Sequence, residues 1–120
     1  MDTSYAAIVT KPSKTIKPVP SISVIDPTRG TVWTNHEYHT VIWKSAWVTG
    51  NVRVEVWKDG VFHSTLVNST SVGNEGTGSC KAYIGSNYYR SGEYQIKVIS
   101  LTNETIFGIS PMFFINEKIF

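Results

Sequence analysis

Alternation of apolar and polar residues with a period of two dominates the middle of the chain. In the segment 51–58, three valines at alternate positions share one face of an extended chain, and charged or aromatic residues share the other. Asp59-Gly60 follows, a pair typical of a two-residue hairpin turn. The pattern predicts a half-buried antiparallel strand that turns back at Asp59, with Val54 in the core and Glu55 in solvent.

Similar alternating segments, separated by Gly, Pro, Asn and Asp, recur roughly every 8–12 residues, as they do in β-sandwiches. No segment has the 3.6-residue periodicity of a helix. The chain is therefore expected to be all-β, an antiparallel two-sheet sandwich of about seven strands. The expected strands cover residues 21–25 with a short continuation at 31–34, then 37–44, 51–58, 61–67, 79–84, 93–101 and 106–115.

The length of 120 residues fits one sandwich domain. Residues 1–20 contain three prolines and three lysines and predict an extended or disordered leader, which leaves 21–120 as a single β-sandwich domain. The composition, 41% hydrophobic and 17% charged with many aromatic and β-branched residues, favours strands. A net charge of +2 is too small to indicate a nucleic-acid partner.

The lone cysteine, Cys80, excludes an internal disulfide, and its alternation with Ala82 and Ile84 predicts a buried thiol. No apolar run approaches the roughly 18 residues of a membrane span, and no signal peptide is visible. The protein is then either intracellular or a mature chain whose leader has been removed. Two sequons in predicted loops, at Asn68 and Asn103, are candidate N-glycosylation sites and favour a secreted origin.

Four segments, in this order and spacing, carry a resemblance to a known family: IDPTRGTVW (25–33), YHTVIWKS (38–45), GNVRVEVWKDG (50–60) and SGEYQIKV (91–98). Over about residues 22–115 the chain resembles the fungal Ser/Thr-rich, GPI-anchored cell-wall family, whose domain also opens yeast proteins required for β-1,6-glucan assembly. The resemblance implies an immunoglobulin-like or fibronectin III-like sandwich, displayed at a cell surface or wall, without enzymatic activity.

Two features depart from the pattern of that family. Residues 80–85 read CKAYIG where the family usually has an aromatic residue and a Trp before an Ile-Pro pair. The chain also ends at Phe120 with neither a Ser/Thr-rich stalk nor the hydrophobic tail of a GPI signal, so no GPI anchor is expected for this chain. A soluble effector or a stand-alone binding domain fits the same residues.

Catalytic and metal-binding motifs are missing from the sequence: no nucleophile elbow, zinc-binding His pair, phosphate-binding loop or Cys pair occurs. The three histidines, at 36, 39 and 63, would need to converge with a carboxylate such as Glu37 to hold a metal, and their spacing predicts surface or turn positions instead. Asp26 and Asp59 precede Pro and Gly and are expected in turns. We expect no enzyme, metal or cofactor.

Exposed aromatic rings are the remaining candidates, because sugar rings stack their apolar C–H faces on flat side chains. Trp33 and Trp43 are expected in the core. The candidate contacts for a glycan or a protein partner are Trp47, Trp57, Tyr88 and Tyr89. In the alternative interpretation, Trp57 covers a neighbouring strand and Tyr88 plugs one end of the sandwich.

Two functional hypotheses follow. The first is a non-catalytic, secreted or cell-surface module that binds cell-wall glucan or supports wall assembly. The alternative is a protein–protein interaction domain, an adhesin or secreted effector, that contacts a surface protein through exposed strand edges and loop aromatics. Both hypotheses place the protein outside the cell or in the cell wall.

Overall fold

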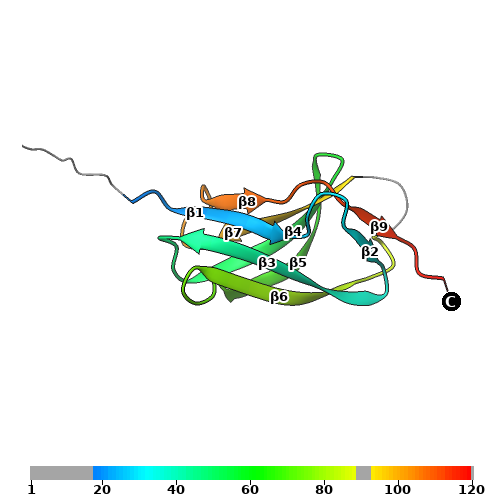
Figure 1. Cartoon of the computed structure of the whole chain (residues 1–120), viewed down its shortest axis with the longest axis horizontal. Helices are drawn as coiled ribbons and strands as arrows, with labels where there is room; N and C mark the ends of the chain where they lie inside the picture. Colours follow the sequence, from blue (N-terminus) through cyan, green and yellow to red (C-terminus); the bar gives the residue numbers. More distant parts are fainter. Residues whose placement is uncertain (1–17, 89–92, 120) are drawn as a thin grey trace, which may run out of the picture.

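The computed structural model describes residues 18–88 and 93–119, and all regular structure within them is β-strand. Most of the leader expected at 1–20 therefore lies outside the described residues. The strands are β1 (Ser21–Asp26), β2 (Val32–Thr34), β3 (Glu37–Ala46), β4 (Asn51–Lys58), β5 (Val61–Ser71), β6 (Thr77–Ile84), β7 (Tyr94–Ser100), β8 (Phe107–Ile109) and β9 (Phe114–Asn116). They run between two ends of an elongated body, with β1 starting at one end and the C-terminus at the other (Figure 1).

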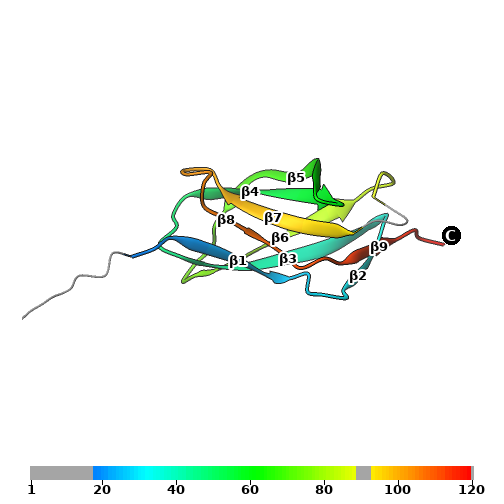
Figure 2. The same ribbon diagram turned by 90° about the horizontal axis from the view of Figure 1, so that it is seen from above.

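Two antiparallel sheets face each other across the core (Figure 2). One has the strand order β1-β3-β6 and the other β5-β4-β7-β8. These orders match strands A-B-E and C′-C-F-G of immunoglobulin-type sandwiches. The expected immunoglobulin or fibronectin III-like sandwich of about seven strands is confirmed, and the short parallel pair β2-β9 is added to it.

The core consists of the inward-facing residues of both sheets. Val52, Val54 and Val56 are fully buried, as the alternation predicted, and so is Trp43. Trp33 is buried as well. The Cys80 thiol is half-buried against this core, and burial raises its pKa.

The hairpin between β4 and β5 confirms the predicted Asp-Gly turn. Asp59 and Gly60 have φ values of 52° and 81°, and two successive positive φ values define the type I′ turn that matches the twist of paired strands. The Asp59 carboxylate also accepts a 2.9 Å hydrogen bond from the backbone N–H of Glu93, which fixes the entry into β7. The turn therefore sets the register of β4 and β5.

Two strand predictions differ from the structure by more than two residues. The expected strand 106–115 is divided into β8 and β9, because Pro111 has no N–H to continue the ladder. β5 continues beyond residue 67 to Ser71 instead of ending before the sequon at Asn68. It stays paired with β4 through three register irregularities, which accommodate the extra length.

Candidate functional site

The outer face of the four-stranded sheet carries a charged network around Glu55. Trp57 Nε1 and Arg53 Nε each donate a 2.9 Å hydrogen bond to the Glu55 carboxylate, one to each oxygen. The guanidinium also reaches Glu104 Oε1 at 3.1 Å, and hydrogen bonds to Glu104 and then Glu55 raise the pKa of Arg53. Glu55 is buried, with only 7% of its surface exposed to solvent, so the prediction that it faces open solvent was wrong.

Lys97 lies beside this network without joining it. It is the cross-strand neighbour of Glu55, but its ammonium lies over two rings, 4.7 Å from the centre of Trp57 and 4.2 Å from that of Phe107. Both Glu55 oxygens already accept hydrogen bonds, and Lys97 forms no ion pair with any described carboxylate. Cation–π attraction to the Trp57 and Phe107 rings holds the ammonium in place.

Further apolar side chains lie next to these two rings, so that an apolar surface crosses the whole sheet. Phe62 packs edge-on against Trp57 at 6.1 Å, and Ile109 is the cross-strand neighbour of Lys97. Phe62, Phe107 and Ile109 are each about half exposed. We call these three residues with Trp57 and Lys97 the lysine–aromatic strip; it crosses β5, β4, β7 and β8, a width of roughly 14 Å at the usual strand spacing.

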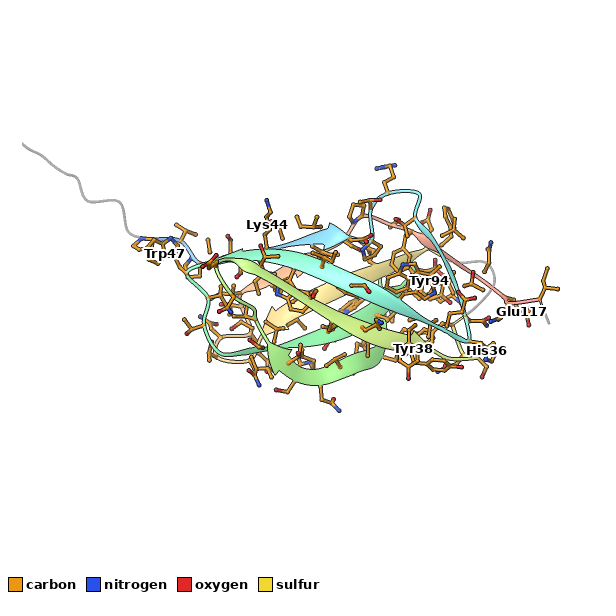
Figure 3. All side chains as sticks on the ribbon, turned by 60° about the horizontal axis from the view of Figure 1, so that its bottom comes forward. His36, Tyr38, Lys44, Trp47, Tyr94 and Glu117 are labelled. Atoms are coloured by element: carbon orange, nitrogen blue, oxygen red, sulfur yellow. The ribbon has the colours of Figure 1, made fainter. Side chains whose placement is uncertain are left out.

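The outer face of the three-stranded sheet is different in character. Tyr38 on β3 and Tyr83 on β6 are register partners, and their rings meet edge to face at 5.2 Å. Tyr38 is 66% exposed and Tyr83 is about half exposed. Figure 3 shows Tyr38 and Lys44 near opposite ends of β3.

Hydroxyl and amino groups follow this tyrosine pair along the two strands. They belong to exposed residues on the same two strands, at alternate positions in register with one another: Thr40 opposite Lys81, and Lys44 opposite Thr77. Between them Ser79 lies opposite Ile42. The face therefore offers two rings, several hydroxyl groups and two ammonium groups, without a described carboxylate at these strand positions.

Trp47 is the most exposed of the three aromatic candidates that lie within the described residues. It is 72% exposed in the β3–β4 loop, and its side chain makes no hydrogen bond or ring contact with another described residue. Figure 3 places it at the end of the molecule where β1 begins. Its φ of 60° is unusual for a bulky residue and costs about 1–2 kcal/mol.

The other three candidates fare differently. Trp57 lies on the outer face, where its ring carries Lys97 and its N–H is bonded to Glu55. Tyr88 is only 6% exposed and hydrogen-bonds the Ser64 hydroxyl, so the expectation that its ring is exposed was wrong and the plug interpretation fits. It is buried because its ring packs 4.9 Å from His63. Tyr89 lies outside the described residues.

Tyr38 and Tyr83 were overlooked in the sequence. The alternation of each strand does place both rings on the outer face. Tyr38 lies on the opposite face of β3 from the buried Val41 and Trp43, and Tyr83 lies on the opposite face of β6 from the buried Ile84. Alternation alone, however, does not reveal that two strands distant in sequence are neighbours. The pairing of β3 with β6 brings the two rings together.

The two sequons have different surroundings. Asn103 lies exposed in the β7–β8 loop, as predicted, and its Oδ1 accepts hydrogen bonds from Thr105 N–H at 3.1 Å and Oγ1 at 2.7 Å. Asn68 is exposed too, but it lies within β5, so its prediction as a loop residue was wrong. Ser69 beside it accepts a bond from Asn51 Nδ2 at 2.7 Å.

The histidines serve separate structural contacts. His39 stacks on Trp33 at 4.9 Å and bonds the backbone of Thr34, whereas His63 Nδ1 lies 2.9 Å from Ser64 Oγ. Among the described residues, no group of three or more His, Cys, Asp or Glu side chains is arranged to hold a metal ion. The same residues contain no helix that is long and apolar enough to cross a membrane.

In comparisons with known proteins, no family model matches the chain. No curated protein matches it either. Among solved structures, the chain is similar to one described as "Structures of Clostridium thermocellum CbhA fibronectin(III)-like modules", with a TM-score of 0.42 and 12% sequence identity. The alignment covers 92% of this chain and 51% of the other, so this chain spans about half the length of that one.

Proposed function

We propose that this chain is a non-catalytic, secreted or cell-wall-associated module that binds wall polysaccharide, with neutral β-glucan as its ligand. The tyrosine pair Tyr38–Tyr83 carries the proposal. Its rings are exposed and contact each other at 5.2 Å, on a sheet face that no described element covers. The resemblance of residues 22–115 to the fungal wall family and the exposed sequon at Asn103 support the location.

The chemistry of this face suits a neutral sugar chain. Tyrosine combines an apolar ring, on which the C–H face of a sugar packs, with a hydroxyl that bonds a sugar hydroxyl. Thr40, Ser79 and Lys81 add donors and acceptors along the strands. At about 3.3 Å per residue, the path along β3 from Tyr38 to Trp47 is roughly 30 Å, long enough for several sugar units.

A pull-down with insoluble β-1,3-glucan and β-1,6-glucan tests the proposal, followed by calorimetric titration with soluble oligosaccharides. We expect Tyr38→Ala and Tyr83→Ala to weaken binding about fivefold or more, about 1 kcal/mol each. Trp47→Ala reports whether the ligand extends to the far end of β3. Phe107→Ala removes an exposed ring from the opposite sheet and is the matched control.

All variants are first checked for an unchanged melting temperature, so that a loss of binding is not a loss of fold. If the wild-type protein is retained by neither glucan, or if Tyr38→Ala, Tyr83→Ala and Phe107→Ala bind alike, the glucan proposal is wrong. Retention that is lost only in Phe107→Ala would place the sugar on the four-stranded sheet instead.

A further inference from the structure

We infer that the lysine–aromatic strip is a docking surface for a protein partner that presents a carboxylate side chain between apolar side chains. This inference is independent of the glucan proposal, because it concerns the other sheet. It starts from the charge left unpaired on the strip, the Lys97 ammonium.

Within the described part of the sheet, no carboxylate forms an ion pair with Lys97. Glu55 is its register partner on β4, but both Glu55 oxygens accept 2.9 Å hydrogen bonds, one from Arg53 and one from Trp57. Glu104 is bonded to Arg53 at 3.1 Å. The ammonium instead lies 4.2 and 4.7 Å from two ring centres, which leaves its N–H donors free to meet a ligand.

The surroundings of the ammonium determine the chemistry of the occupant. A purely apolar partner would remove the Lys97 charge from water with only the two ring contacts as compensation and with no acceptor for its N–H groups, which is unfavourable. A carboxylate placed on the ammonium would form a charge-assisted hydrogen bond, and the apolar side chains on either side of that carboxylate would exclude water from it on binding. Charge complementarity therefore requires one acidic group above Lys97.

The remaining contacts favour a polypeptide. Phe62, Phe107 and Ile109 are half-exposed apolar groups on both sides of Lys97, in rows set by the strands. Clustered aromatic side chains with apolar neighbours are the usual anatomy of the centre of a protein interface. A neutral sugar is a poor fit, because the two rings nearest the centre already have the ammonium over them.

The probe is a panel of synthetic twelve-residue peptides with one central Glu or Asp between Val, Ile, Leu or Phe residues. Each peptide has a twin in which Gln or Asn replaces the acid. Titration into the isotope-labelled full chain, followed by NMR, locates binding through the Trp57 indole N–H and the amides of Lys97 and Ile109. We expect shifts on the strip and at least about tenfold weaker binding by the twins.

Lys97→Gln and Lys97→Met test the role of the ammonium, and both should bind the acidic peptides at least about tenfold more weakly. Lys81→Gln, an exposed lysine on the other sheet, is the matched control and should bind as the wild type does. Unfolded variants would be recognised by collapsed NMR dispersion. In that case Phe62→Ser, at a half-exposed position, replaces them as the test variant and should weaken binding as well.

Several outcomes overturn the inference. They are the absence of any carboxylate-dependent shift on the strip, equal binding of acid and amide twins, and wild-type binding by Lys97→Met. Self-association through the strip in sedimentation, or saturation of the strip by oligogalacturonate but not by peptides, would assign it to a second copy or to an acidic glycan. Failure here leaves glucan retention through Tyr38 unchanged, so the two proposals fail separately.

Discussion

Trp43 and Gly78 are register partners on β3 and β6, and the indole of Trp43 occupies the space that a side chain at position 78 would need. A Cβ on Gly78 would lie 2.4 Å from Trp43 Nε1 and 2.2 Å from the Val72 carbonyl oxygen. That oxygen accepts the indole N–H at 2.9 Å. The absence of a side chain therefore lets the indole reach its buried acceptor.

Gly78→Ala should consequently destabilise the domain by about 1–3 kcal/mol, the usual cost of overpacking a core. The measurement is the midpoint of urea unfolding. Gly85→Ala is the matched control, since the nearest contact of its Cβ is Asn87 Oδ1 at an ordinary 3.6 Å. Equal midpoints for the two variants would contradict the packing described for Trp43.

A second prediction compares the two faces of β4. Val54→Asp should cost about 3 kcal/mol or more, because it places an unpaired carboxylate in a fully buried position. Glu55→Ala should cost about 1–3 kcal/mol, because it leaves the Trp57 N–H and one Arg53 N–H without their acceptor.

Glu55→Gln serves as the control for this comparison, since its amide keeps one acceptor oxygen and should recover part of the loss. Thermal or urea unfolding measures all three variants. A Glu55→Ala protein as stable as the wild type would show that the carboxylate lies in open solvent, as the alternation alone suggests.

The pattern along the chain was sufficient for most of the core and insufficient for the surface. Alternation is a local property of a strand, so it located Val54 and Trp43 correctly. The burial of a residue on the outer face, by contrast, depends on which other side chains cover it, and alternation does not show that. Glu55 is buried because its neighbours Arg53 and Trp57 fold over it, and no periodicity encodes that.

The candidate sites illustrate the same limit. Tyr88 follows a loop-like sequence and looked exposed, but its hydroxyl reaches Ser64 on a strand far away in the sequence. The lysine–aromatic strip depends on the registers of four strands at once, and those registers follow from turns and bulges rather than from residue type. Trp47, by contrast, is exposed although its loop is held in place: Val48 packs against the core, and the Gly50 carbonyl accepts a hydrogen bond from the Val72 N–H.

The third prediction concerns the thiol of Cys80. Burial raises its pKa, so at neutral pH the folded protein holds the unreactive protonated form. Reaction with a disulfide reagent should be slow in the native state and fast in guanidinium chloride. Rapid native labelling at neutral pH would contradict the half-buried position.

The same shift has a consequence for stability at alkaline pH. Above about pH 8.5 the unfolded chain releases the thiol proton while the folded chain retains it, so the contribution of Cys80 to stability falls as pH rises. Comparison of the wild type with Cys80→Ala isolates this contribution from other groups. Their stability difference should shift in favour of Cys80→Ala between neutral pH and pH 10, and a constant difference would contradict the shift.

The last prediction uses salt to separate the two outer faces. Glucan binding through Tyr38 and Tyr83 involves uncharged ligand groups, so raising the ionic strength from low to about 1 M should change it little, and chelators should have no effect. Peptide binding at Lys97 brings opposite charges together at a surface and should weaken over the same range. Parallel titrations of one protein sample with both probes make the measurement. If salt weakens glucan binding and peptide binding equally, the Lys97 charge does not distinguish the two faces. If chelators weaken glucan binding, a metal takes part for which the described residues offer no site.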